Sequence, residues 1–324
     1  MKTPARQHGV ALLTVLLLVL VMSTLLVGLL DDIRFGLRRS SNSETVAQAR
    51  WDALAAEAFA RRRIDALAGL PAAADAAGGR RSFALPVEQG LLEASVEDAS
   101  HCFNLNSVVQ GANEFVVRRE AGVRQYLALL QALDIPEAHA RQLADTLVDW
   151  IDGDQQPQPH GHEDAAYRSG GGGYLTASTR LAEPSELRAL RGYDPDTYAR
   201  LRPWVCALPG HAPAPLNVNT LLPAQAPLLV MLTGGALDVA AAQAVIAARP
   251  ASGWPDVTAF WREPMLQALA LDNAMLAQAE VRPRLFRLHV QVTRGPARLV
   301  LASLLEQGAD GRTRLLSRQW NTPE

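Results

Sequence analysis

The sequence lacks both an excess of charge of one sign and the usual marks of an enzyme. Its 324 residues carry 31 basic and 33 acidic side chains, which leaves a formal net charge of −2. Without a basic excess, neither nucleic acid nor an anionic lipid surface is favoured as a partner. No nucleophile elbow and no phosphate-binding loop occur. Outside one acidic stretch, nothing in the chain therefore favours catalysis.

Cysteine is nearly absent as well, since only Cys102 and Cys206 occur. In an oxidising compartment the two could pair and close a long loop. On the chain-entropy model such a bond stabilises the fold by about 4–5 kcal/mol. The alternative is a pair of buried free thiols, and the cysteines alone leave both open.

Charge is missing altogether from residues 10–30, an apolar run that ends at Asp31 and Asp32. As a helix this run is about 31 Å long, which is enough to cross a bilayer core. A secretory signal has a shorter run, of about 7–15 residues, and a small-residue cleavage site. We therefore predict a membrane anchor rather than a discarded signal or a buried soluble helix. Basic residues precede the run, so the N-terminus is expected in the cytoplasm.

Helical periodicity continues from Asp31 to about Ala68 and stops at Gly69 and Pro71. Anchor and periodic segment together predict one long helix. Short strands are predicted on both sides of a long intervening region, by alternation and turn residues. They cover residues 81–87, 91–99, 284–292, 297–307 and 312–320. A long helix beside a small antiparallel sheet is an α+β fold.

Between residues 103 and 283 the strand signal gives way to helical patterns, which predicts an inserted helical domain. A loose helix–turn–helix repeat occurs at residues 130–150, 187–205 and 229–249. It resembles the helix-hairpin-helix of DNA-binding proteins, whose turns need glycines and nearby cations to hold phosphate. These turns carry acidic residues that repel phosphate, so a packing role is favoured. They are Asp134, Asp194, Asp196 and Asp238.

The stretch from Asp149 to Ser169 holds the densest chemistry of the chain. Asp152 and Asp154 follow a predicted helix, and Glu163 and Asp164 return at the far end of the loop. Clustered carboxylates repel one another unless a cation joins them, and a flexible all-oxygen loop suits calcium. The spacing is not that of an EF-hand.

Three other interpretations of this stretch stay open. It could be a solvated acidic loop that binds no metal. His160 and His162 could be ligands of a zinc ion, but they lack the helical HExxH spacing. Two of the carboxylates could also serve as general acid and base in a hydrolase, as in glycoside hydrolysis.

Taken together, these features carry a resemblance to a known family. The leader ending at Gly9, followed by VALLTVLLLV, looks like a type IV prepilin-like signal. The chain then resembles the minor pseudopilin K family of the type II secretion system, with the family's motifs in the same order. They are CFNLNS (102–107), LVDWIDGD (147–154), HEDAAY (162–167), SELRAL (185–190), VCALP (205–209) and LNVNT (216–220).

The resemblance implies an α+β fold in which a pilin-like N-terminal helix packs on a small antiparallel sheet. A large inserted all-α domain with helix-hairpin-helix-like repeats completes it. The expected parts are a prepilin leader (1–9), a transmembrane and assembly helix (10–30), a pseudopilin α+β domain (31–102 and 284–324) and the helical insertion (103–283).

Site residues follow from the same resemblance. Prepilin peptidase would cleave after Gly9, and Val10 would become the N-methylated first residue. Cys102 and Cys206 match the family's disulfide. Calcium would bind the acidic loop, where four residues match the motif best and two are further candidates. The four are Asp152, Asp154, Glu163 and Asp164, and the two are Asp149 and Glu186.

Thr14 occupies the fifth position after the cleavage point, where most pilin-like proteins have glutamate. That glutamate is understood to pair with the N-terminal amine of a neighbouring subunit. A buried carboxylate without such an amine is costly, so a subunit with nothing above it gains by losing the group. Thr14 therefore favours a tip position. The alternative is that the glutamate was replaced by a polar residue through neutral drift.

The expected protein is a structural subunit, not an enzyme, at the tip of the pseudopilus. It would start pseudopilus assembly with the minor pseudopilins I and J, for export of folded proteins across the outer membrane. It would cross the bacterial inner membrane once, with its C-terminal domain in the periplasm. The alternatives are a minor pilin of a type IV pilus and a membrane-anchored periplasmic hydrolase that uses the acidic loop.

Overall fold

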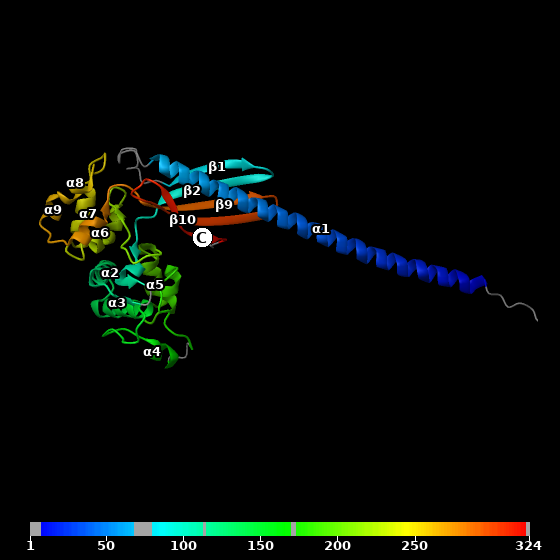
Figure 1. The fold of residues 1–324 in the computed structure, drawn as a ribbon, viewed down its shortest axis with the longest axis horizontal. Helices are drawn as coiled ribbons and strands as arrows, with labels where there is room; N and C mark the ends of the chain where they lie inside the picture. The colour runs from blue at the N-terminus through cyan, green and yellow to red at the C-terminus, as the bar shows by residue number, and fades with distance from the viewer. Residues whose placement is uncertain (1–7, 68–79, 113–114, 170–172, 322–324) are drawn as a thin grey trace, which may run out of the picture.

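One helix, α1 (His8–Leu67), is 60 residues long and forms the axis of the molecule (Figure 1). The computed structural model describes residues 8–67, 80–112, 115–169 and 173–321. Residues 11–44 of α1 are exposed along their whole length, and only the last third of the helix packs on a sheet. The prediction of a single helix from anchor to about residue 68 is confirmed. Most of the predicted leader, residues 1–7, lies outside the described residues.

Within the described part of the chain, α1 is the helix that is long and apolar enough to cross a membrane. Its most apolar window has a mean hydropathy of 2.8, and none of that window is buried inside the protein. Side chains with this composition are stable in lipid or against other apolar helices, and not in water. The structure thus agrees with a single-pass anchor.

The sheet has five antiparallel strands in the spatial order β1-β2-β9-β10-β11. Their alternating burial explains why the sequence pattern located all five to within about two residues. In β10, for example, Leu299, Leu301 and Leu305 are buried on one face. The bounds are β1 (Arg81–Val87), β2 (Gly90–Asp98), β9 (Leu285–Arg294), β10 (Ala297–Gln307) and β11 (Thr313–Trp320).

Small side chains let α1 approach the sheet closely. The buried positions recur every three or four residues, as a helix facing a sheet requires. Those residues are Ala49, Ala53, Ala56, Ala60 and Ile64. Glu57 lies among them and is almost fully buried, at 3% exposure. Its carboxylate accepts hydrogen bonds from Arg318 (2.7 and 2.9 Å) and from the Ser303 hydroxyl (2.7 Å).

The insertion leaves the sheet after β2 and returns at β9, two strands that are neighbours in the sheet. It lies beyond the end of the sheet that is farthest from the N-terminal half of α1 (Figure 1). Nine of its described segments are α-helices. They are α2 (Glu120–Ala132), α3 (Glu137–Ile151), α4 (Asp164–Ser169), α5 (Pro195–Leu201), α6 (Ala226–Leu232), α7 (Val239–Ala247), α8 (Val257–Trp261), α9 (Pro264–Gln267) and α10 (Asn273–Gln278).

The insertion is not purely helical, which corrects the all-α expectation. Three two-stranded ribbons occur in it, and their strands are two to four residues long. Runs this short have no measurable period, so a sequence pattern cannot reveal them. The pairs are β3 (Phe103–Asn104) with β6 (Val205–Cys206), β4 (Val109–Ala112) with β5 (Phe115–Arg118), and β7 (Leu216–Asn217) with β8 (Ala279–Glu280).

The acidic residues of the helix–turn–helix repeats have a structural task. Asp194 caps α5 by accepting a hydrogen bond from the Thr197 amide (2.7 Å). Asp238 caps α7 in the same way through the Ala241 amide (2.7 Å). Such caps satisfy backbone donors that have no partner inside the helix. The turns are therefore built for helix packing, as the sequence predicted.

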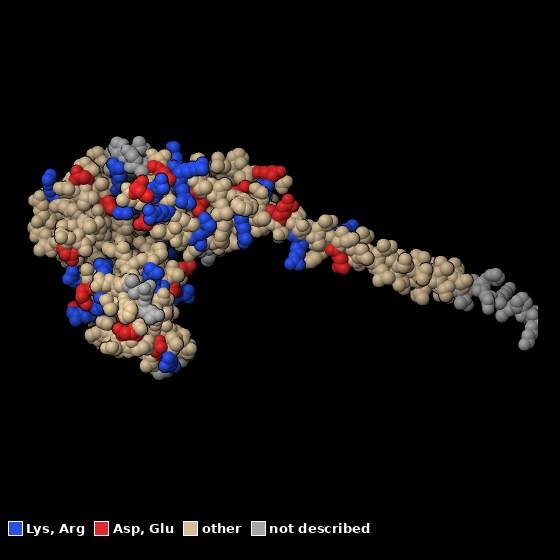
Figure 2. Space-filling view, in the orientation of Figure 1, with Lys and Arg blue, Asp and Glu red and all other residues tan. Residues whose placement is uncertain are grey.

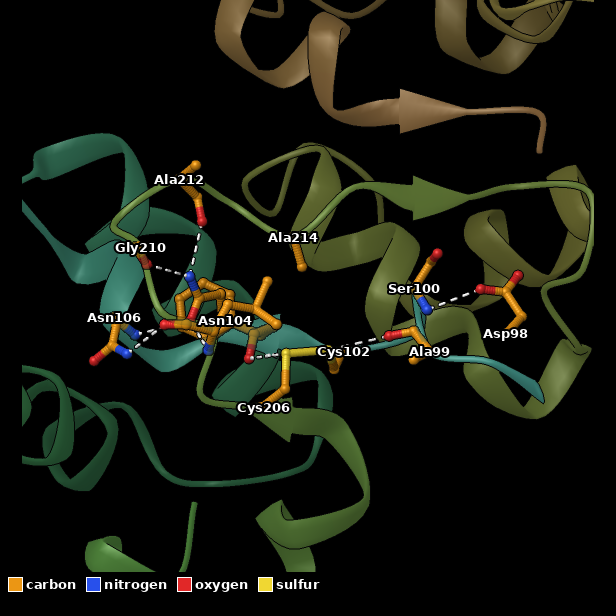
Figure 3. The surroundings of a disulfide bond; sticks show 12 residues. Asp98, Ala99, Ser100, Cys102, Asn104, Asn106, Cys206, Gly210, Ala212 and Ala214 are labelled. Carbon is orange, nitrogen blue, oxygen red and sulfur yellow. Dashed lines mark hydrogen bonds between the residues drawn. A yellow bond between two sulfur atoms is a disulfide. The ribbon is translucent and has the colours of Figure 1, made fainter. Parts of the chain in front are cut away.

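The predicted disulfide joins Cys102 to Cys206, with a Cα–Cα distance of 5.7 Å. It lies beside the parallel pairing of β3 with β6 and ties together the two ends of the first half of the insertion (Figure 3). Next to it, the Asn104 side chain donates hydrogen bonds to the carbonyl oxygens of Gly210 and Ala212 (2.9 and 2.8 Å). A covalent bond and an amide network thus close the same junction.

Candidate metal site

The acidic loop begins where α3 ends. Asp152 is the C-terminal cap of that helix, and Glu163 directly precedes α4. Apolar residues of α3 recur at helical spacing and are buried, which fixes the direction of its last turn. The loop between the two helices then folds back, so that residues eleven positions apart in sequence meet.

Three carboxylates converge at this point. Asp152, Asp154 and Glu163 each offer one oxygen, and these oxygens all lie within 4.8 Å of one another. Asp152 and Glu163 are buried, with 2% and 5% exposure, while Asp154 is exposed. Among the described residues, no hydrogen-bond donor reaches Asp152 Oδ1, Glu163 Oε1 or Glu163 Oε2. Buried carboxylate oxygens without hydrogen-bond donors are costly unless a cation or a proton compensates them.

The electrostatics of the group point the same way. Burial, reinforced by the charges of Asp154 and Asp149, raises the pKa of Asp152 to about 7. Burial and the neighbouring carboxylates, Asp149 first among them, raise the pKa of Glu163 to about 8. A divalent cation would remove this repulsion. The three atoms that could bind a metal are all oxygens, and the group is open to solvent on the side of Asp154. Both features fit calcium better than zinc.

Asp149 lies on α3, three residues before Asp152, and holds the loop onto this helix. Its carboxylate is fully buried and accepts a hydrogen bond from the Gln158 amide (3.0 Å). Burial raises its pKa to about 6, against the effect of hydrogen bonds from the Gln158 and His162 backbone. The loop can come this close only because residue 161 is glycine, since a Cβ there would lie 1.9 Å from Asp149 Oδ2.

The other two expected ligands are engaged elsewhere. Asp164 accepts hydrogen bonds from the Thr176 amide and hydroxyl (3.0 and 2.9 Å), at the first turn of α4. Glu186 accepts from the Ala182 and Glu183 amides in a capping box (2.6 and 2.9 Å). Neither carboxylate belongs to the group of three that converges.

The two histidines of the loop also lie apart from that group. His162 shares a hydrogen bond with the Thr146 hydroxyl (3.2 Å), and His160 lies 3.7 Å from the Asp145 carboxylate. Burial lowers the pKa of His162, aided by the charge of Arg191. The three carboxylates are therefore without a nitrogen ligand from these side chains.

An aromatic cluster beside the site escaped the sequence analysis. Trp150 packs edge-on against Tyr167 of α4, with ring centroids 5.4 Å apart, and Tyr174 completes the cluster. These rings fix α4 against α3 and thereby set the position of Glu163. The only signal in the sequence is the position of aromatic residues next to the acidic ones.

The residues assigned to processing and assembly lie at the start of α1. Gly9 and Val10 are part of this helix. Thr14 is exposed, and its hydroxyl donates a hydrogen bond to the Ala11 carbonyl oxygen (2.9 Å) within the same helix. Thr14 is uncharged, and this internal hydrogen bond satisfies its hydroxyl donor, so the side chain can enter an apolar environment at little cost.

Two family models with the same description, "Type II secretion system (T2SS), protein K", match residues 101–210 and 216–282. A type II secretion system protein K from Klebsiella pneumoniae is 35% identical over 313 residues, covering 95% of this chain and 94% of that protein. The chain belongs to the type II secretion system protein K family. Its function is accordingly that of a minor pseudopilin, and the family is one of structural subunits.

Further relatives agree with this membership. The Aeromonas hydrophila protein K is 32% identical over 322 residues and covers 97% of both chains. A solved chain from the GspK-GspI-GspJ complex of enterotoxigenic Escherichia coli has a TM-score of 0.71 and 30% identity. It covers 88% of this chain and 100% of its own length. The pilin-like fold with a helical insertion is therefore shared with that chain.

Proposed function

We propose that this protein K forms the tip of the type II secretion pseudopilus and starts its assembly together with minor pseudopilins of the I and J types. The observation that carries this proposal is the position of the insertion. It lies at the end of the molecule farthest from the apolar half of α1, where another subunit would otherwise stack (Figure 1). The similar solved chain from Escherichia coli belongs to a complex with GspI and GspJ, which supports the choice of partners.

The exposed half of α1 would serve twice in this function. Before assembly it anchors the subunit in the inner membrane, with the N-terminus in the cytoplasm and the sheet and insertion in the periplasm. After cleavage behind Gly9 and methylation of Val10, it packs against the apolar helices of other pseudopilins. Its complete exposure from residue 11 to residue 44 supports such a role, because no residue that the structure describes covers it.

Calcium would bind at the acidic loop through Asp152, Asp154 and Glu163, with Asp149 positioning the loop. The ion would neutralise the clustered carboxylates and link the end of α3 to the start of α4. The buried oxygens that have no hydrogen-bond donor support this assignment. The oxygens gather within 4.8 Å, closer than the carboxyls of inverting glycosidases (about 6.5–9.5 Å) or retaining ones (about 5–5.5 Å), so a structural function is favoured over catalysis.

Substitutions at position 14 test whether the protein lies at the tip of the pseudopilus. At the tip, a Thr14→Glu carboxylate would find no amine above it, so secretion of exoproteins should fall, while Thr14→Ser should behave like wild type. In the interior of a fibre, glutamate at this position would be harmless or favourable. Equal secretion by the two variants, with both chains stable and copurifying with the I and J pseudopilins, would contradict the tip position.

Processing has its own test. In cells that contain prepilin peptidase, Gly9→Ala should leave the full-length chain uncleaved, which a gel resolves from the mature chain. Mature-sized protein from this variant would show that the glycine is not the cleavage site.

A further inference from the structure

Three arginines lie on α1 shortly after the apolar segment and just beyond Asp31 and Asp32. We call Arg34, Arg38 and Arg39 the juxtamembrane arginines, and they outnumber the two adjacent carboxylates. Figure 2 shows the change from the uncharged N-terminal part of α1 to a charged section between it and the globular part. All three side chains are exposed. Arg34 lies 4.0 Å from Asp31. No described carboxylate forms a salt bridge with Arg38 or Arg39, which leaves two cations without a protein partner in the described chain.

The length of the helix places these residues at a definite depth. With a rise of about 1.5 Å per residue, they lie roughly 6–14 Å beyond the end of the apolar run at Leu30. A hydrocarbon core of about 30 Å within a bilayer of about 40–45 Å leaves a headgroup layer of roughly 5–8 Å on each side. Side chains of a helix point back toward its N-terminus, here toward the membrane. The guanidinium groups can therefore reach the phosphate layer.

Apolar side chains alternate with the arginines over the same turns. Ile33, Phe35 and Leu37 are exposed, at 49%, 69% and 65%. In water alone these groups would have no favourable surroundings. A mixture of apolar and basic residues is typical of the membrane interface, where the stems lie among acyl chains and the charges reach headgroups.

We propose that the juxtamembrane arginines bind the phosphate groups of anionic phospholipids, at the periplasmic surface of the inner membrane. Arginine suits this ligand, because its planar guanidinium forms paired hydrogen bonds to phosphate oxygens. The inference rests on the membrane anchoring proposed above. It concerns a local cluster, so the net charge of −2 for the whole chain does not oppose it. The contact would hold the subunit at a fixed height until assembly removes it from the bilayer.

The test uses the full chain in nanodiscs that contain phosphatidylglycerol and phosphatidylcholine. Lipids retained by the released protein are quantified by native mass spectrometry. Wild type should retain phosphatidylglycerol preferentially, and the preference should weaken about fivefold for each arginine removed in Arg38→Ala and Arg39→Ala. The matched control is Arg62→Ala with Arg63→Ala, which removes the same charge from exposed positions of the same helix, roughly 36 Å farther from the membrane.

Three results would overturn the proposal. The first is an unchanged lipid preference in the Arg38→Ala, Arg39→Ala variant, and the second is an equal loss in the control. The third is weakened copurification with I-type and J-type pseudopilins at unchanged lipid preference, which would assign the arginines to a partner's carboxylates. Carbonate extraction of membranes tests the anchor separately from the arginines. A chain that leaves the membrane in carbonate is not anchored, whereas a chain that stays in the membrane and shows one of these results is anchored but does not bind lipid through the arginines.

Discussion

Two buried glutamates, in two regions of the molecule, experience opposite surroundings. Glu57 lies between α1 and the sheet at 3% exposure, and Glu163 lies in the acidic loop at 5%. Burial alone would raise the pKa of Glu57, but hydrogen bonds from Arg318 and Ser303 outweigh it and lower the pKa below its ordinary value. Glu163 has no such donors and faces other carboxylates, so its pKa is raised to about 8.

The difference teaches how to separate a structural carboxylate from a ligand. Both side chains are desolvated at similar cost, and only the partners differ. The sheet supplies a guanidinium for Glu57 from within the chain, whereas the loop around Glu163 supplies further negative charge. A group that the fold leaves uncompensated points to something outside the fold, which in our proposal is a cation.

The largest effect should come from opening the disulfide, which encloses the acidic loop but not the sheet. Replacing both Cys102 and Cys206 by serine should destabilise the protein by about 4–5 kcal/mol, because the unfolded chain regains loop entropy over a separation of 104 residues. Amide exchange should accelerate within residues 120–205 and stay slow in β9 and β10. Equal acceleration in the sheet would show that the two regions do not behave independently.

The next effect should come from removing the buried pair in the sheet region. Glu57→Ala leaves Arg318 beside a cavity and without its counter-charge. We expect the free energy of unfolding, measured with denaturant, to fall by about 3 kcal/mol. This is the low end for a buried pair, because Arg318 is partly exposed. The control is Asp52→Ala, which removes another α1 carboxylate that pairs with a sheet arginine, Arg294. The Asp52 side chain is more exposed than that of Glu57, at 18% against 4%, and Arg294 keeps a second partner in Glu88, so this substitution should cost about 1 kcal/mol or less.

Calcium should act on the other region alone. At a free concentration of 100 times its Kd, calcium should raise the free energy of unfolding by about 2.7 kcal/mol over a chelated sample. Glu163→Gln should abolish this increment. Glu57→Gln should keep it, although that variant starts from lower stability. Asp164→Asn should also keep it, because this carboxylate is engaged with Thr176. Loss of the increment in Asp164→Asn but not in Glu163→Gln would reverse the assignment of ligands.

The smallest effect, taken for each pH unit, is a pH dependence in the absence of calcium. Folding raises the pKa of Asp152 from 3.8 to about 7 and that of Glu163 from 4.5 to about 8. Between these values, the folded protein binds more protons than the unfolded chain. Stability in chelator should therefore fall as pH rises through this window, by on the order of 1 kcal/mol for each pH unit. Glu57, whose pKa is lowered, acts in the opposite direction below its ordinary value. Chelated stability that rises from pH 5 to pH 8 would contradict the loop electrostatics.

Part of the candidate site followed from the sequence, and part did not. Asp152, Asp154 and Glu163 could be proposed as ligands because two clusters of acidic residues flank a loop of prolines and glycines. In the sequence, Asp164 ranks with these three and Glu186 is a further candidate, yet Asp164 binds Thr176 and Glu186 closes a capping box. Which carboxylate points inward depends on how α4 packs against Trp150, and no local pattern contains that information.

What the sequence by itself determined is everything that repeats at a short period or stands out in composition. Twenty-one uncharged residues, helical spacing up to about residue 68 and alternating strands produce α1 and the five-stranded sheet. Only the tertiary structure decided which of the buried charges is compensated, which acidic residues converge and where the short ribbons of the insertion form. Those outcomes depend on contacts between residues far apart in the chain, whose energies arise only once the insertion and the sheet have packed.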